Sequence, residues 1–116
     1  MQYALTIYDD QSKWSDLPPD SPRETSEAYA RLTEEMRSAG VFRAGEGLQP
    51  ATTATTVRVP NGERIVTDGP FAETKEQLGG FYVVDCKDLD EAIEWASKIP
   101  TAKSGCVEVR PVIQYD

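Results

Sequence analysis

Residues 80–99 read GFYVVDCKDLDEAIEWASKI, and this stretch decides the fold. Its first part, residues 80–86, contains a hydrophobic run that predicts a strand. Asp88 then offers an N-cap carboxylate to a helix that Pro100 stops. The apolar side chains of this helix recur at helical spacing, at Leu89, Ala92, Ile93, Ala96 and Ile99. The stretch therefore predicts a strand followed directly by a helix over 89–99.

A second unit of the same kind stands at the start of the chain. Residues 2–8 alternate strictly between two sets of side chains, which predicts a strand, and a polar loop over 9–20 follows. Ser21-Pro22-Arg23-Glu24 has the form of a capping box with proline at the first helical position. Because Gly40 supplies the left-handed residue that ends a helix, a helix is predicted over 22–39.

Three further strands complete the expected elements. A strand over 41–48 should kink at Gly45-Glu46-Gly47, since glycine inside a strand often marks a bulge. Runs over 53–59 and 63–67 flank Asn61-Gly62, a strong hairpin signal because both residues accept positive φ. The last strand lies over 105–112, where apolar and polar residues alternate.

The order of elements is strand-helix-strand, an inserted hairpin, then strand-helix-strand. This order predicts an α+β fold, a ferredoxin-like βαβ-βαβ sandwich, as a single domain over residues 1–116. Both faces of the strands over 2–8 and 80–86 carry apolar or aromatic residues. Because the helices cover one face, we expect the other face to pack against a second copy in a homodimer.

Composition restricts the partners. The chain has 12 basic and 20 acidic residues, a net charge of −8, so nucleic acid and anionic membrane surfaces should repel it. No apolar run is long enough to span a membrane, and we expect a cytoplasmic protein. The absence of histidine removes Ser-His-Asp and Cys-His catalysis, and Cys86 and Cys106 lack a zinc-binding set. We expect both thiols to be reduced and strand-borne, with no metal and no cofactor.

The segment over 67–80 predicts a site. Gly69-Pro70 turns the chain, so that Asp68 is fixed at a strand end, where its carboxylate suits a general base. Lys75 would balance a substrate anion, and Phe71 would supply an apolar wall. The structural alternative is that Asp68 only forms an Asx-turn and Lys75 pairs with a neighbouring acid.

Three residues outside this segment are candidates for the same cleft. Tyr8 and Tyr82 offer phenol hydroxyls, although buried tyrosines more often serve packing. Glu46, between two glycines, can extend its carboxylate into the cleft or stand exposed on a bulge. The ligand-binding set is therefore predicted to be Tyr8, Glu46, Asp68, Gly69, Pro70, Phe71, Lys75 and Tyr82.

Asp68-Gly69-Pro70-Phe71, followed by Glu73-Thr74-Lys75-Glu76 and Gly79-Gly80-Phe81, resembles the DGPF subgroup of the YCII-related family. The resemblance extends over nearly the whole chain. It implies a ferredoxin-like subunit in the dimeric α/β-barrel superfamily. It also implies a link to sigma-factor regulation, because relatives are often encoded beside sigma factors. The wider family has been suggested to be enzymatic because of a His and an Asp in a cleft, but this chain lacks the His.

Three functions follow. The favoured one is a homodimer that binds a small molecule or a protein partner near the DGPF loop, linked to sigma-factor regulation. The alternative is a cofactor-independent enzyme in which Asp68 acts as general acid or base on a small substrate held by Lys75 and Tyr8. A cofactor-free oxidase, a third function, has support from the superfamily resemblance alone.

Overall fold

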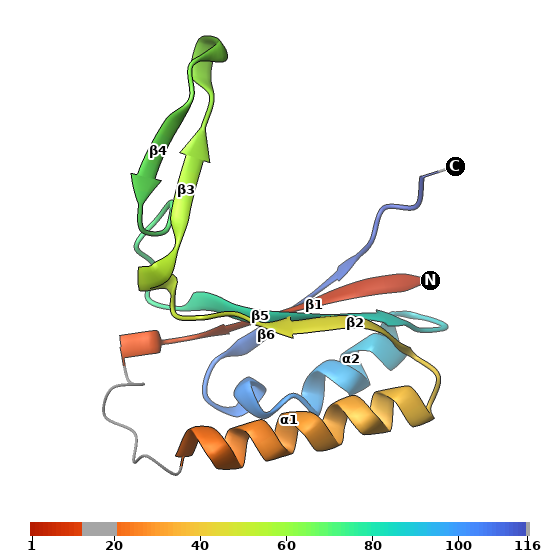
Figure 1. Ribbon diagram of the computed structural model, residues 1–116. Coiled ribbons are helices and arrows are strands. Elements are labelled where there is room, and N and C mark those ends of the chain that lie inside the picture. The colour runs from red at the N-terminus through yellow and green to blue at the C-terminus, as the bar shows by residue number, and fades with distance from the viewer. Residues whose placement is uncertain (13–20, 116) are drawn as a thin grey trace.

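The computed structural model describes residues 1–12 and 21–115, the side chains of residues 21–25 excepted. The side chains of the predicted capping box and most of the polar loop before it lie outside the described part of the chain. The remaining elements form one four-stranded sheet with two helices on one of its faces, and a separate two-stranded sheet that stands off the other face (Figure 1).

The four-stranded sheet consists of β1 (Gln2–Asp9), β2 (Phe42–Gly47), β5 (Gln77–Asp85) and β6 (Cys106–Pro111), in the order β2-β5-β1-β6. Each neighbouring pair is antiparallel. The helices α1 (Ser21–Ser38) and α2 (Leu89–Ser97) pack below it. The prediction of a mixed α+β fold is confirmed, and the strand order is compatible with the ferredoxin-like arrangement.

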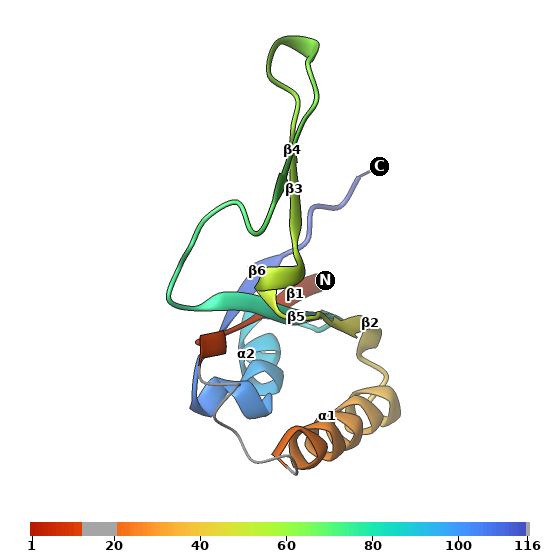
Figure 2. The ribbon, with the colours of Figure 1, turned by 60° about the vertical axis from the view of Figure 1, so that its left-hand side comes forward.

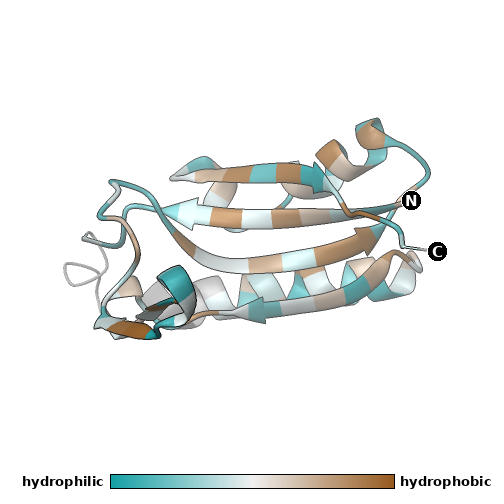
Figure 3. Cartoon of the chain, turned by 90° about the horizontal axis from the view of Figure 1, so that it is seen from above, coloured by the Kyte–Doolittle hydropathy of each residue, from teal (hydrophilic) through white to brown (hydrophobic). Residues whose placement is uncertain are grey.

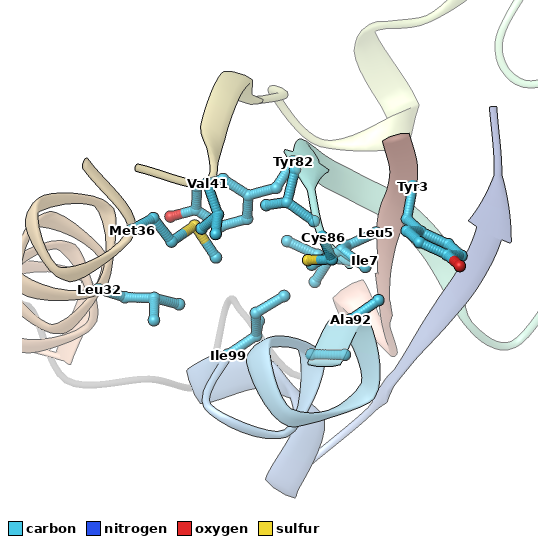
Figure 4. Packing of buried hydrophobic residues seen from close by; sticks show 12 residues of the cluster. Tyr3, Leu5, Ile7, Leu32, Met36, Val41, Tyr82, Cys86, Ala92 and Ile99 are labelled. Atoms are coloured by element: carbon cyan, nitrogen blue, oxygen red, sulfur yellow. The ribbon is translucent and has the colours of Figure 1, made fainter. Parts of the chain in front are cut away.

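The core lies between the sheet and the helices. Alternate residues of β1 and β5 point towards the helices, which is the period-two pattern read in the sequence. They meet apolar residues from α1 and α2, as Figure 4 shows. The fully buried side chains at the centre of this cluster are Leu5, Met36, Val84 and Ile99.

The helix ends follow the local chemistry of the chain. The Asp88 carboxylate accepts a hydrogen bond from the Glu91 amide at 2.9 Å, and the Glu91 carboxylate accepts one from the Lys87 amide at 3.1 Å. At the end of α1, Gly40 has φ of 77°, and the Val41 amide donates to the Met36 carbonyl at 3.0 Å. α2 stops at Ser97, two residues before its predicted end, and a 3-10 turn, η4 (Pro100–Lys103), follows.

The strands β3 (Thr55–Arg58) and β4 (Ile65–Asp68) pair antiparallel with each other and project away from the body (Figures 1 and 2). Asn61 and Gly62 both have positive φ, at 53° and 81°. Pairing nevertheless ends at Arg58 and Ile65, so the connection is longer than a two-residue turn. A 3-10 turn over Pro60–Gly62 occupies it, because Pro60 has no N–H to continue the ladder.

This projection makes the molecule extended. The radius of gyration is 16.0 Å, whereas a compact domain of this length would have about 13 Å. Figure 3 looks down on the sheet face that the projecting strands stand above, with the helices behind it.

Candidate functional site

A cavity of about 980 Å³ lies between α1 and the sheet. Residues of β1, α1, β2, β5 and η4 line it. We call it the interlayer cleft and define it by Ile7, Tyr29, Thr33, Phe42, Tyr82 and Thr101. Because both layers of the fold contribute to its walls, the shape of the cleft depends on how α1 sits on the sheet.

A hydroxyl pair joins the two layers at this cleft. Tyr82 in β5 and Thr33 in α1 lie with their hydroxyl oxygens 2.8 Å apart. Thr33 also donates to the backbone carbonyl of Tyr29 at 2.9 Å. Because a threonine hydroxyl has one proton, the Tyr82 hydroxyl must be the donor to Thr33. Tyr82 is 5% exposed and keeps an acceptor lone pair after this donation.

A second hydroxyl pair links α1 to η4. The Tyr29 hydroxyl and Thr101 Oγ1 are 2.7 Å apart. Burial raises the pKa of Tyr29 despite this hydrogen bond, and the nearby charge of Asp9 acts in the same direction. The ring of Tyr29 is stacked on that of Tyr82 with centroids 6.4 Å apart, and Phe42 meets Tyr82 edge-on at 6.3 Å. Three aromatic rings therefore form an apolar wall of the cleft, with hydroxyls at its margin.

Glycine in β2 makes room for the Tyr82 ring. A Cβ at Gly45 would lie 2.7 Å from Tyr82 Cδ1, closer than side chains tolerate. Gly47, two residues on and also lining the cleft, would meet nothing within 4 Å. The kink was predicted at Gly45-Glu46-Gly47, but these residues pair in regular register with β5, and the irregularity lies earlier, between Phe42 and Ala44. Gly45 thus sets the position of Tyr82, and Gly47 leaves part of the cleft empty.

Charged groups stand at different parts of the cleft lining. The Asp9 carboxylate accepts a hydrogen bond from the Asp10 amide at 2.9 Å and lies 3.5 Å from the Ser104 hydroxyl. Arg37 places its guanidinium 4.9 Å from the centroid of the Phe42 ring and 3.9 Å from the Glu34 carboxylate. The basic group is thus engaged by two partners on the protein itself.

Four of the eight predicted site residues line a cavity, and they are divided between two cavities. Tyr82 lines the interlayer cleft from the buried face. Glu46 also borders it, but its exposed side chain lies on the other face of the sheet, so its carboxylate does not extend into the cleft as predicted. Pro70 and Lys75 line a second cavity of about 450 Å³, together with Gln11. We call this second cavity the loop groove. Tyr8, Asp68, Gly69 and Phe71 line neither cavity.

The Asp-Gly-Pro-Phe turn is held against β3. Gly69 has φ of 99°, its amide donates to the Ala54 carbonyl at 2.7 Å, and its carbonyl accepts from the Thr56 hydroxyl at 2.7 Å. Asp68 ends β4 opposite Thr55 and is exposed. Phe71 is 78% exposed. In a single copy the turn therefore presents its carboxylate and its ring to solvent, without the apolar wall that was expected around Asp68.

Tyr8 and Tyr82 do not share a wall. Buried and half-buried residues alternate along β1 and β5, which puts Tyr82 on the helix side and Tyr8 on the opposite side of the sheet. The interlayer cleft instead uses Asp9, Tyr29, Thr33 and Thr101, which were not predicted as site residues. Nothing local distinguishes Tyr29, Thr33 or Thr101 as site residues, because the packing of α1 and η4 creates their role.

The two thiols are free and differ in environment. Cys86 is buried one residue beyond β5, and burial raises its pKa to about 11. Cys106 is exposed at the start of β6, with its sulfur 3.8 Å from the Glu76 carboxylate. Within residues 1–12 and 21–115, no helix is long and apolar enough to cross a membrane. The same part of the chain contains no group of three His, Cys, Asp or Glu residues arranged to hold a metal ion.

Fold and cleft define a small α+β protein with a cavity between its sheet and its first helix. The model of the YCII-related domain matches residues 1–116, so the chain belongs to the YCII-related family. It is also 40% identical over 117 residues to an uncharacterized protein of Rhizobium meliloti (strain 1021), across 99% of this chain and 94% of that protein.

Proposed function

We propose that the protein binds a small organic molecule in the interlayer cleft. The observation that carries this proposal is the cavity of about 980 Å³, walled by aromatic rings and bordered by two pairs of hydrogen-bonded hydroxyl groups. Ligand sites are typically concave, largely apolar and about 300–1,000 Å³ in volume, with a few placed polar groups. The interlayer cleft has this character, whereas no aromatic side chain is found among the described residues that line the loop groove.

The polar groups of the cleft are organised before any ligand arrives. Thr33 is held by the Tyr29 carbonyl, Tyr82 by Thr33, and Tyr29 by Thr101. A ligand that meets groups already fixed in position loses less conformational entropy on binding. These three hydrogen bonds therefore support a specific binding site rather than a packing defect.

The proposed functional form is a homodimer of the DGPF subgroup. Its two copies are joined through the open face of the sheet, which is the face turned away from the helices. On that face Phe81 and Val83 are half-buried, beside Thr6 and Ala4 of β1. The projecting strands add exposed apolar side chains at Val57, Val59, Ile65 and Val66. An extended apolar surface of this kind usually marks an interface, and a second copy would cover it. Phe71 at the adjacent turn would join the same interface.

Catalysis by Asp68 is the alternative function. Its carboxylate is exposed and lines neither cavity. A general base works best when its surroundings raise its pKa towards the working pH, so this function requires a second copy to enclose Asp68. Regulation of a sigma factor is supported by the family resemblance alone. Ligand binding in the interlayer cleft requires neither a second copy around Asp68 nor a sigma factor.

The test is a thermal-shift screen of a metabolite library against the wild type and Gly47→Phe. Because a Cβ at Gly47 meets nothing within 4 Å, the phenyl ring can enter the cleft without displacing the backbone. A ligand of the cleft should raise the melting temperature of the wild type by mass action and lose this effect in Gly47→Phe. Ile93→Phe, which adds a ring on the exposed side of α2, is the matched control and should respond like the wild type.

Two results would contradict the proposal. The first is a hit that stabilises Gly47→Phe as much as the wild type, because the ligand would then bind elsewhere. If that hit were lost in Asp68→Asn instead, the DGPF loop would be the site. The second is the absence of any hit in a folded wild-type protein.

A further inference from the structure

We infer that the interlayer cleft selects an organic cation, an amine or guanidine with an apolar body, whose charged group binds Asp9 and whose body lies on the aromatic wall. This inference rests on the proposed function, because it names the class of ligand for the same cavity. It is argued from the hydrogen-bonding capacity and the charge of the cleft lining.

The paired hydroxyl groups of Tyr29, Thr33, Tyr82 and Thr101 offer a ligand more acceptors than donors. The Thr33 proton goes to the Tyr29 carbonyl, and the Tyr82 proton goes to Thr33. Tyr82 is therefore left as an acceptor. Tyr29 and Thr101 share one hydrogen bond, which leaves one hydroxyl proton between them for a ligand. A ligand rich in N–H donors matches this surface better than a ligand rich in acceptors.

The charges of the lining favour the same ligand. Asp9 of β1 brings a carboxylate to the cleft, whereas the Glu46 side chain lies on the other face of the sheet, on the same side as Phe81. Among the described lining residues the basic side chain is Arg37, which is engaged by the Phe42 ring and by Glu34. The net charge of −8 adds a long-range field that attracts cations. An anionic ligand would have to compete for Arg37 and would meet the Asp9 carboxylate.

Asp9 is the anchor within this set. Its carboxylate is oriented by the Asp10 amide at 2.9 Å, and its other oxygen has a long 3.5 Å contact with the Ser104 hydroxyl. The negative charge of Asp9 also contributes to the raised pKa of Tyr29, which agrees with a position inside the cleft. Ile7, on the same strand, and Tyr82 supply apolar surface to the same cavity. A ligand whose ammonium group binds Asp9 can thus place its apolar body in the same cavity.

The experiment compares three probes with the same phenyl-ethyl body: 2-phenylethylamine, 2-phenylethanol and 3-phenylpropionate. Binding to the wild type, Asp9→Asn and Glu108→Gln is measured by calorimetric titration at neutral pH. Glu108 lies in β6 on the other face of the sheet, so Glu108→Gln changes the net charge equally without touching the cleft. The expected result is that the amine binds about tenfold more tightly than the alcohol, as one charge-assisted hydrogen bond would give. Asp9→Asn should abolish that preference and leave alcohol binding unchanged, while Glu108→Gln should retain the preference.

Each other outcome overturns the inference in a distinct way. Tightest binding of the propionate, or an amine preference that persists in Asp9→Asn, would show that Asp9 does not select the ligand. If a library compound stabilises the wild type but not Gly47→Phe, while the three probes bind equally or not at all, the inference of a cationic ligand is wrong and the proposed function stands. If neither library nor probes bind the folded protein, both fail together.

Discussion

The hydroxyl oxygen of Tyr82 lies 2.8 Å from Oγ1 of Thr33, and this contact ties the sheet to α1 across the interlayer cleft. It comes from residues 49 positions apart in the sequence. Thr33 donates its hydroxyl proton to the Tyr29 carbonyl, so the two partners are not equivalent. Tyr82 needs Thr33 as its acceptor, whereas Thr33 keeps a hydrogen bond to Tyr29 when Tyr82 is absent.

This asymmetry predicts unequal costs for the two deletions. Thr33→Val leaves the buried Tyr82 hydroxyl without its partner and should lower the free energy of unfolding by about 1–3 kcal/mol. Tyr82→Phe removes the hydroxyl itself and should cost about 0.5–1.5 kcal/mol. Urea unfolding of both variants measures the difference. Thr33→Ser, which keeps the hydroxyl, is the control and should cost less than Thr33→Val. Equal costs for Thr33→Val and Tyr82→Phe would contradict the donor assignment.

Gly45 and Gly47 form a matched pair on one strand. Gly45→Ala would place a Cβ 2.7 Å from Tyr82 Cδ1, so the ring must move. Overpacking of this kind should destabilise the protein by about 1–3 kcal/mol and change the near-ultraviolet circular dichroism of the tyrosines. Gly47→Ala meets nothing within 4 Å and should change stability by less than about 0.5 kcal/mol. Equal melting temperatures for Gly45→Ala and Gly47→Ala would contradict the steric role assigned to Gly45.

The Asp88 carboxylate caps α2 by accepting from the Glu91 amide at 2.9 Å. Asp88→Ala should therefore lower the free energy of unfolding by about 1 kcal/mol, measured by urea unfolding. Asp90→Ala removes another acid from the same first turn without removing the cap and should cost less. A larger loss in Asp90→Ala than in Asp88→Ala would mean that general charge, not the cap, stabilises this helix end.

The fold could be predicted from the sequence because its signals are local. Alternation in β1 and the cap at Asp88 specify the elements, and their order then limits the topology. The Asn61-Gly62 signal was correct about positive φ but not about loop length, because Pro60 interrupts the ladder first. Element ends were less predictable, as at Ser97, where the apolar stripe continues past the last helical residue.

The candidate site was less predictable because its parts are ordinary residues made special by packing. Thr33 has no sequence signal, and its role depends on where Tyr82 of another element reaches. A site was predicted at the Asp-Gly-Pro-Phe turn because its local chemistry is distinctive, and Gly69 does have a positive φ. In one copy, however, that chemistry positions a turn against β3, and the large cavity lies on the other side of the sheet.

Cys86 gives the protein a specific dependence on alkaline pH. Burial, followed by the proximity of Glu91, raises the pKa of its thiol from 9.0 to about 11. The folded state then holds the proton more tightly than the unfolded state. The associated stability is fully present below pH 9 and is lost as the pH rises through about 11.

Urea unfolding across this pH range measures the effect. The free energy of unfolding of the wild type should fall more steeply than that of Cys86→Ala, which lacks the titrating group. Cys106→Ala, which removes an exposed thiol, should follow the wild type more closely. Parallel pH curves for the wild type and Cys86→Ala would show that the Cys86 thiol is not linked to folding.

Val83 tests the proposed dimer through the open face of the sheet. It is half-buried there, opposite Ala4, while its neighbours Tyr82 and Val84 are buried on the helix side. A carboxylate at this position would be desolvated in a sheet-to-sheet interface, so Val83→Glu should convert a dimer of twice 12.8 kDa into a monomer with unchanged far-ultraviolet circular dichroism. Sedimentation equilibrium measures the mass. Ile93→Glu makes the same exchange on the exposed side of α2 and should remain dimeric. A wild type that sediments as a monomer would remove the interface, but it would leave the interlayer cleft, which a single copy encloses, as the binding site.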